Sequence, residues 1–327
     1  MPEISIILPI YNVENYLERC LNSIKDQTFK DFEVLCINDG SPDNSQAIVE
    51  SFVAMDSRFK SFIKPNGGLS DARNYGLARC TSKYVMFIDS DDFVELDVLS
   101  EVYHKAESLA LDIVIFDFYQ LYVVDNTRKI IANDFDQELV YNLEEKPELL
   151  CYVNNAAWNK FYRRTLFSDN KIQYPVGYHQ EDLGTTPKLL YLAKRIGFVN
   201  KPLYNYLVDR PNNITQQYDK KIYHIIDMNI EYLEFYKQND IFVKYYEPLK
   251  YLCVVNMLNS MKKIDKFTDY QFVKKFINDS YKFIKYYFPD FPAAIYELKK
   301  EKQDFIYLNR FLLTLYIEFR RLRGKLK

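Results

Sequence analysis

The first 116 residues alternate short apolar runs with segments of helical periodicity, and this pattern limits the folds open to the chain. The runs, rich in β-branched and aromatic residues, are residues 4–8, 32–37, 84–88 and 112–116. Across residues 13–24, apolar side chains recur at spacings of three and four, which predicts an amphipathic helix. Strands that alternate with helices form parallel sheets covered by helices. We therefore expect an α/β fold with a mainly parallel, Rossmann-like central sheet.

Local signals place the starts of three helices. Asn12 can cap the first one, because its side-chain oxygen can accept a backbone N–H of the first turn. Ser41 can cap a second helix that starts with Pro42, whose missing N–H costs nothing there. A third helix is expected to start near Ser70 and to lead into the strand that ends at Ile88.

Polar clusters follow three of the expected strands. They are Tyr11 with Asn12, the N-D-G-S stretch at residues 38–41, and the D-S-D-D stretch at residues 89–92. In an open parallel sheet the carboxyl ends of the strands share one edge, and ligands bind in the crevice there. The three clusters are therefore expected to converge on one site.

The acidic cluster has the composition of a metal site. Asp89 and Asp91 face one side of an extended segment, while Asp92 points elsewhere. Carboxylate oxygens suit Mn²⁺ or Mg²⁺, which would bridge them to phosphate oxygens. The alternative is a solvated turn whose aspartates cap the next helix.

Two other stretches favour a nucleotide ligand. N-D-G-S is common in turns, but at the end of a buried strand Asp39 can accept hydrogen bonds from a base or ribose. Gly67 and Gly68 precede a helix that carries Arg73 in its first turns. A helix N-terminus and an arginine both favour phosphate, although the spacing is not that of a P-loop.

Charge and cysteine content exclude several classes of protein. The net charge of −2 gives no electrostatic case for nucleic acid binding. The five cysteines are odd in number and form no C-x-x-C pair, which is typical of reduced core residues. No signal peptide and no run of about 18 apolar residues is visible, so we expect a cytoplasmic protein.

The ordered motifs resemble those of the family 2 glycosyltransferases. They are I-I-L-P-I-Y-N at residues 6–12, N-D-G-S at 38–41, G-G-L-S-D-A-R-N at 67–74 and D-S-D-D at 89–92. The resemblance covers roughly residues 3–215. It implies a GT-A fold, a nucleoside-diphosphate sugar donor, a divalent metal (Mn²⁺ or Mg²⁺), and inversion at the anomeric carbon.

This resemblance also sets the expected domain boundaries. Because 327 residues exceed one typical domain, we expect a GT-A catalytic domain at residues 1–217 and a second module after it. Within the first, residues 1–116 would bind the nucleotide sugar and residues 117–217 the acceptor. Residues 218–327, dense in Tyr, Phe, Ile and Lys at helical spacing, are expected to form a C-terminal all-α appendage.

Donor-binding roles follow from the resemblance residue by residue. Pro9, Tyr11 and Glu14 would line the nucleotide pocket. Asp39 would hold the base, which in such enzymes is most often uracil.

The remaining donor-side roles fall on the third and fourth motifs. Asp71 and Arg73 would lie along the nucleotide and its phosphates. Asp89 would approach the ribose or sugar, and Asp91 would ligate the metal. Asp92 would contact the sugar or support its neighbours.

The family also places an acidic pair at the start of a helix, and here that pair is Glu181 with Asp182. Inversion needs one carboxylate within hydrogen-bond reach of the acceptor hydroxyl. We expect Asp182 to be this base and keep Glu181 in reserve, because the two side chains point about 100° apart on a helix. Outside the family context, such a pair would be an ordinary helix cap. The sequence G-T-T-P at residues 184–187 departs from the family pattern.

Three further residues are candidates for the acceptor side and for a closing loop. Trp158 would stack on the acceptor sugar, or it packs in the core. His179 lies beside the acidic pair and would contact the acceptor or the metal. Arg210 resembles an arginine that closes on the pyrophosphate, although Asn213 stands where the family often has serine.

The C-terminal end combines a helical apolar stripe at residues 305–322 with five positive charges at residues 320–327. A basic amphipathic end can lie on an anionic membrane, where lipid-linked acceptors are presented. The alternatives are a helix packed on the appendage with a solvated tail, or a homodimer contact through the aromatic helices.

The function expected from these features is inverting transfer of a sugar, with UDP the favoured nucleotide, to a hydroxyl of a glycan or lipid-linked oligosaccharide. A non-catalytic, nucleotide-binding scaffold subunit of a glycan assembly complex is the alternative. A nicotinamide-dependent dehydrogenase is disfavoured, because no G-x-G-x-x-G follows the first strand.

Overall fold

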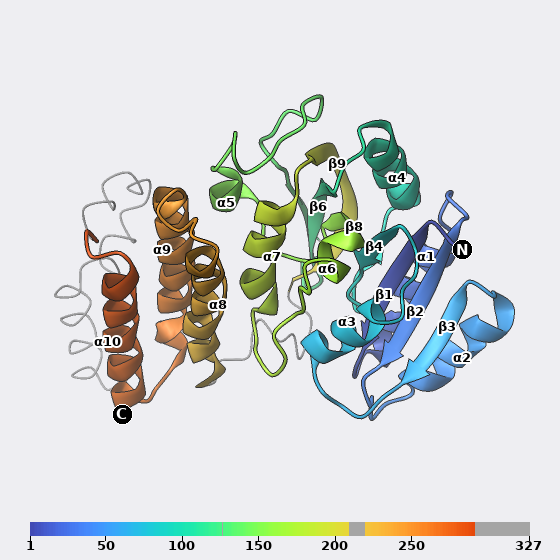
Figure 1. Ribbon diagram of the computed structural model, residues 1–327. Coiled ribbons are helices and arrows are strands. Elements are labelled where there is room, and N and C mark those ends of the chain that lie inside the picture. Colours follow the sequence, from blue (N-terminus) through green and yellow to red (C-terminus); the bar gives the residue numbers. More distant parts are fainter. Residues whose placement is uncertain (126, 209–219, 292–327) are drawn as a thin grey trace. The chain divides into compact units, whose positions relative to one another are not determined.

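The computed structural model of the chain describes residues 1–125, 127–208 and 220–291 (Figure 1). The chain divides into two compact units, residues 1–213 and 214–327. The predicted boundary at residue 217 lies outside the described residues.

A mixed sheet forms the centre of the first unit. Its strand order in the described part of the chain is β3-β2-β1-β4-β8-β6-β9-β5, with β7 paired to β6. The strands are β1 (Ile4–Ile10), β2 (Phe32–Asn38), β3 (Phe59–Ile63), β4 (Tyr84–Phe87), β5 (Phe93–Val94), β6 (Ile113–Tyr122), β7 (Thr127–Ile131), β8 (Lys160–Arg163) and β9 (Ile196–Leu207).

Most of these strands run in one direction. β1 pairs in parallel with β2 and β4, and β2 pairs in parallel with β3. β8 is antiparallel to both β4 and β6, so β6 and its parallel partner β9 share the direction of β1. The predicted α/β fold with a mainly parallel sheet is confirmed.

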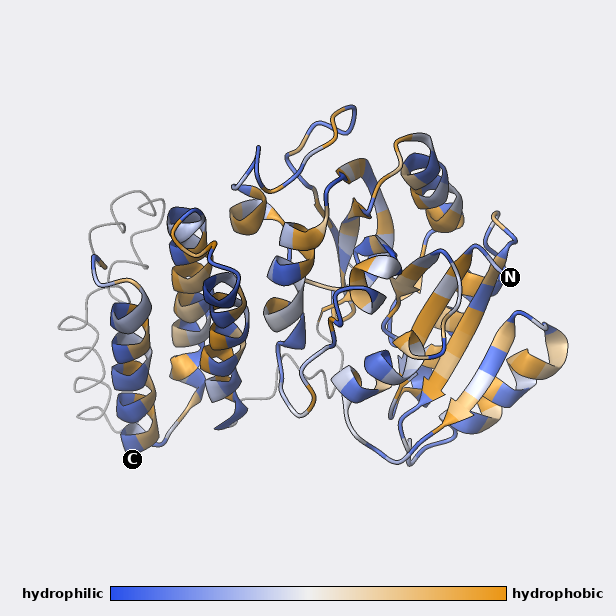
Figure 2. Ribbon diagram, in the orientation of Figure 1, coloured by the Kyte–Doolittle hydropathy of each residue, from blue (hydrophilic) through white to orange (hydrophobic). Residues whose placement is uncertain are grey.

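Helices pack on this sheet. The helices of the first unit are α1 (Glu14–Lys25), α2 (Ser45–Met55), α3 (Leu69–Leu77), α4 (Val98–Ser108), α5 (Leu149–Tyr152), α6 (Thr165–Ser168) and α7 (Glu181–Leu192). All seven residues of β1 and all seven of β2 are buried, because helices cover them. Figure 2 shows these strands as largely hydrophobic, whereas the helices carry hydrophilic residues as well.

Two local predictions were wrong. α2 begins at Ser45 and not at Pro42, because Asp43 accepts the Ser45 N–H and the Ser41 hydroxyl in a turn before the helix. α1 begins at Glu14, and Asn12 makes no cap hydrogen bond, because its backbone is left-handed with φ 55°.

Strand β3 was missed in the sequence. It lies at the edge of the sheet, pairs with β2 alone, and is only partly buried. Its sequence F-K-S-F-I therefore lacks the continuous apolar run that marks the central strands.

The second unit is helical in its described part, as predicted for the appendage. It contains the short 3₁₀ segments Lys220–Tyr223 and Lys263–Lys266, and the helices α8 (His224–Gln238), α9 (Tyr246–Lys262) and α10 (Tyr270–Tyr287). α9 packs against both α8 and α10. None of the described helices is long and apolar enough to span a membrane.

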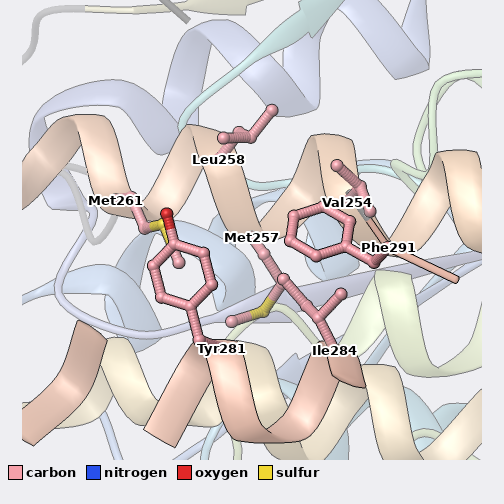
Figure 3. Close-up of a pocket in the computed structure, with 7 residues that line it drawn as sticks. All are labelled: Val254, Met257, Leu258, Met261, Tyr281, Ile284 and Phe291. Carbon is pink, nitrogen blue, oxygen red and sulfur yellow. The ribbon is translucent and has the colours of Figure 1, made fainter. Parts of the chain in front are cut away.

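A small apolar pocket lies between α9 and α10 (Figure 3). Its lining side chains are all buried and come from these two helices and the residues after them: Val254, Met257, Leu258, Met261, Tyr281, Ile284 and Phe291. Apart from the Tyr281 hydroxyl its lining is apolar, so we assign this pocket to the core of the second unit.

The contact of α3 with the central strand requires a glycine. A Cβ atom on Gly76 would lie 2.6 Å from Cγ2 of Ile7, which is buried in β1. We expect Gly76→Ala to lower the free energy of unfolding by about 1–3 kcal/mol, because a packed core resists added volume.

The matched control is the same substitution in an Ile7→Ala background, where the obstructing side chain is gone. Chemical denaturation of all four proteins gives the coupling. Equal losses in the two backgrounds would contradict the steric explanation.

Candidate active site

The carboxyl ends of β1, β2 and β4 meet at one edge of the sheet, as predicted. The Asp39 N–H donates to the Ile10 carbonyl at 2.9 Å, and the Ile88 N–H donates to Ile7 at 3.1 Å. The acidic segment that follows β4 therefore lies at the same edge as the segments that follow β1 and β2.

A buried arginine gathers carboxylates at this edge. The side chain of Arg73, on α3, is 1% exposed. Its NH1 donates to Glu181 at 2.8 Å and to Asp182 at 2.6 Å, and its NH2 donates to Asp89 at 3.0 Å. One guanidinium thus joins the segment after β4 to the first turn of α7, about a hundred residues further along the chain.

The charges of this cluster do not balance. Three ionised carboxylates around one guanidinium would leave two excess negative charges in a buried place. Burial raises the pKa of both Glu181 and Asp182, while the positive charge of Arg73 opposes the rise. A proton is therefore held by this pair at a pH where exposed carboxyl groups have lost theirs.

Not every polar atom of the cluster is satisfied. Nε of Arg73 and the hydroxyl of Tyr174 are buried without a hydrogen-bond partner in the described part of the chain. The guanidinium carbon lies 5.2 Å from the centre of the Tyr174 ring, so the aromatic face offsets part of the cost.

The second oxygen of Asp182 is held by the loop before β8. Oδ2 accepts the Ala157 N–H at 3.0 Å. Lys160, which is fully buried, fixes this loop by donating to the carbonyls of Asn154 and Ala156 and to the side chain of Asn159. Burial lowers the pKa of Lys160 to about 7, and the charge of Asp182 opposes this shift. This role of Lys160 was not predicted.

Trp158 is placed in the core. It is 7% exposed, and its ring stacks with Tyr204 at 4.5 Å and Tyr206 at 5.2 Å. Phe118 packs edge-on against it at 4.7 Å. This burial favours the packing interpretation over stacking on an acceptor sugar.

Asp92 turns inward, away from the surface of the acidic segment. It is fully buried and accepts the Tyr204 hydroxyl and the Leu207 N–H, both at 2.8 Å. The same hydroxyl accepts the Asp89 N–H at 3.1 Å. Asp92 therefore ties the acidic segment to the end of β9, which fits a supporting role. Asp91 is partly exposed beside it.

A second ionic group lies after β2. Asp39 accepts the Gly67 N–H at 2.9 Å and the Gly68 N–H at 2.8 Å. Nζ of Lys64 contacts both Asp39 and Asp71. Lys64 belongs to none of the motifs identified in the sequence and stands between the apolar residues Ile63 and Pro65, so its contacts with Asp39 and Asp71 were not predicted.

The remaining candidates lie around these two groups. Pro9 is buried in β1, whereas Tyr11 is half exposed. Glu14 accepts the backbone and side-chain N–H groups of Asn44 at 2.9 Å, which joins the starts of α1 and α2. His179 is partly buried just before α7. Arg210 and the basic stretch at residues 320–327 lie outside the described residues.

The buried acidic pair predicts a pH dependence of stability. Glu181 has a higher pKa in the folded protein than in the unfolded chain, so the folded state holds a proton that the unfolded chain releases. The contribution of Glu181 to the free energy of unfolding is complete below the pKa that Glu181 has in the unfolded chain. It is lost as the pH rises through the pKa that Glu181 has in the folded protein.

We therefore expect the free energy of unfolding to fall as the pH rises above the ordinary range of glutamate, by up to about 1.4 kcal/mol per pH unit. In Glu181→Gln this fall should be shallower. Urea denaturation across a pH series measures both proteins, and parallel curves would exclude the proposed titration.

Comparison with known proteins identifies the family. The model of glycosyl transferase family 2 matches residues 5–170, which is half of the chain. GlyA of Streptococcus pneumoniae serotype 4, named as a glycosyltransferase, is 34% identical over 232 residues, covering 68% of this chain and 33% of GlyA. EpsH of Bacillus subtilis is 29% identical over 274 residues, covering 78% of this chain and 77% of EpsH. The chain thus spans a third of GlyA and about three quarters of EpsH.

A solved structure shares the fold. Staphylococcus aureus TarS, residues 1–349 in complex with UDP-GlcNAc, has a TM-score of 0.60 and 20% identity, covering 99% of this chain and 88% of that one. With the family match over the segment that carries Asp39, Arg73, Asp89 and Asp91, the chain belongs to glycosyl transferase family 2.

Proposed function

We propose that the chain transfers a sugar from a nucleoside-diphosphate sugar, with UDP as the nucleotide, to a hydroxyl of a glycan or lipid-linked oligosaccharide, with inversion at the anomeric carbon. The observation that carries this proposal is the ionic cluster of Arg73, which holds Asp182 at the same sheet edge as Asp89.

Asp182 is the better candidate for the general base. Its side chain is 19% exposed, against 9% for Glu181, so an acceptor hydroxyl reaches it more easily. Each of its oxygens accepts one hydrogen bond, which leaves a lone pair on each for the hydroxyl proton. The base takes this proton while the hydroxyl oxygen attacks the anomeric carbon from the face opposite the leaving diphosphate.

Glu181 complements this base. Burial and the neighbouring charge of Asp182 both raise its pKa, so Glu181 is the member of the pair that holds the shared proton. Asp182 then remains ionised, and the guanidinium fixes its orientation toward the acceptor.

The donor would lie between the two ionic groups. Asp39 and Asp71 would contact the base and ribose, Tyr11 would cover the base from the exposed side, and Pro9 and Glu14 shape the floor. Asp89 would face the ribose or sugar.

Arg73 changes its role in this proposal. With NH1 and NH2 directed to carboxylates, it would hold Asp89 and the acidic pair in place and would not bind the phosphates itself. We propose that Arg210, and not Arg73, contacts the pyrophosphate of the donor.

The acidic segment fits a divalent cation. Asp89 and Asp91 supply carboxylate oxygens, and the described residues contain no group of three or more acidic, histidine or cysteine side chains that could hold a metal alone. Water and the donor phosphates would complete the coordination of Mn²⁺ or Mg²⁺. The bound ion would offset the charge that develops on the leaving diphosphate.

The relatives support the choice of donor and acceptor class. TarS was solved with UDP-GlcNAc, which supports a UDP-sugar donor. Another relative, over 66% of this chain, is named as a teichoic acid biosynthesis protein, which supports a glycan acceptor. On the acceptor side, we propose His179 as a contact, because it lies two residues before Glu181 in the segment that leads into α7.

This proposal predicts metal-dependent nucleotide binding. Calorimetric titration of UDP should show binding with Mn²⁺ that weakens at least tenfold when the metal is chelated. Asp91→Asn should bind UDP with Mn²⁺ as weakly as the metal-free wild type, because a ligand oxygen is lost.

The matched control is Asp31→Asn, which removes an exposed aspartate before β2, at the opposite end of that strand. It should bind UDP like the wild type. UDP binding that is the same with and without metal would remove Asp91 from the metal site.

A further inference from the structure

Lys64 occupies an unusual position for a lysine. It follows β3 directly and its side chain is 8% exposed, although lysines are rarely buried. Its ammonium group has three N–H donors and three oxygen neighbours: Asp39, Asp71 at 2.5 Å and the Pro65 carbonyl at 2.6 Å. All of its donors are therefore engaged within the protein.

The carboxylate of Asp39 is nearly saturated as a result. Among the described residues, Oδ1 accepts both Lys64 and the Gly67 N–H, while Oδ2 accepts only the Gly68 N–H. Each carboxylate oxygen has two acceptor positions, so one position remains, on Oδ2. Because only 4% of its side chain is exposed, Asp39 can accept one hydrogen bond from a ligand, at Oδ2.

The glycine loop holds this arrangement. A Cβ on Gly67 would lie 2.2 Å from the Asp71 carboxylate, and Gly68 has a left-handed backbone with φ 88°. The Asn66 side chain also donates to the Asp39 carbonyl at 3.0 Å. The two backbone N–H groups and the ammonium therefore reach Asp39 from fixed directions.

Nucleobases differ in the N–H donors that they can direct to such a carboxylate. Uracil and thymine present one ring N–H between two carbonyls. Guanine presents a ring N–H next to an amino group, and this pair of donors binds best to both oxygens of one carboxylate. Cytosine has no hydrogen on the equivalent ring nitrogen.

We propose that Lys64 is a specificity-determining residue that, by occupying Oδ1 of Asp39, restricts the donor to nucleotides whose base offers a single ring N–H. The inference rests on the proposed nucleotide-sugar function and names the residue that excludes guanine. The ion pairs keep Lys64 charged despite its burial, since its contacts with Asp39 and Asp71 outweigh desolvation and raise its pKa.

The test is calorimetric titration with UDP and GDP, in Mn²⁺, of wild type and Lys64→Met, which keeps the length of the side chain but removes its donors. Wild type should bind UDP at least tenfold more tightly than GDP. In Lys64→Met this preference should shrink at least fivefold, because Oδ1 becomes available to the second guanine donor.

Lys60→Met is the matched control. Lys60 lies on β3 and is ion-paired with Glu33, but it does not contact Asp39. It should keep the wild-type preference. If Lys64→Met weakens UDP and GDP by the same factor, Lys64 only supports the loop and the proposal is wrong.

Wild type alone provides a second test, should Lys64→Met fail to fold by circular dichroism. UDP and dTDP should bind within about threefold of each other, and CDP and GDP at least tenfold more weakly. Equal binding of GDP would overturn the role of Lys64, and equal binding of CDP would overturn the contact of the base with Asp39, but either result would leave the transferase proposal standing. No binding of any nucleoside diphosphate would instead overturn the transferase proposal itself.

Discussion

The buried guanidinium of Arg73 is the contact on which the site depends. Taking an arginine out of water costs several kcal/mol unless its hydrogen-bond donors are satisfied, and removing one partner of a buried ion pair typically costs about 3–5 kcal/mol. Here the partners come from α7 and from the segment after β4. Both segments must therefore be in place before the charge of Arg73 is compensated.

The same principle recurs at two buried lysines. Lys160 is held by two carbonyls and an amide, and it fixes the loop whose Ala157 N–H binds Asp182. Lys64 is held by two carboxylates and a carbonyl, and it fixes the loop around Asp39. In both lysines all three N–H donors of the ammonium group are engaged within the protein, and the loop that each lysine fixes orients an acidic side chain. Preorganised carboxylates of this kind need no rearrangement when the substrate arrives.

Local patterns in the sequence predicted the architecture well. The strands β1, β2, β4 and the first half of β6 were found because continuous apolar runs mark strands buried on both faces. The strands β8 and β9, which also lie within the sheet, were not predicted. The edge strand β3 was missed because Lys60 and Ser61 interrupt its pattern. The start of α2 was predicted too early because Ser41 and Asp43 are both common in turns. In the folded chain Asp43 accepts the Ser45 N–H at the start of the helix, and Ser41 donates to Asp43 instead.

The residues of the Arg73 cluster were named from the sequence, but their pairing was not predicted. The motifs identified Arg73, Asp89 and the acidic pair, yet the position of the arginine near a helix N-terminus suggested phosphate as its partner. The two carboxylates that Arg73 contacts on α7 lie more than a hundred residues further along the chain, so no local pattern could reveal them. Lys64 carried no signal either, because most lysines are exposed and burial is a property of the folded chain.

The central claim is that Arg73 holds Asp182 as the base of a sugar transfer, and the turnover of UDP-sugars with Mn²⁺ tests it most directly. Wild type should release UDP from at least one donor in a panel of UDP-sugars. Asp182→Asn should bind UDP normally but lose about 10²–10⁴ in kcat, and Glu181→Gln should lose much less. Turnover of Asp182→Asn within tenfold of wild type, with a larger loss in Glu181→Gln, would contradict the assignment of the base. A wild type that binds UDP but turns over no donor would instead support a scaffold subunit.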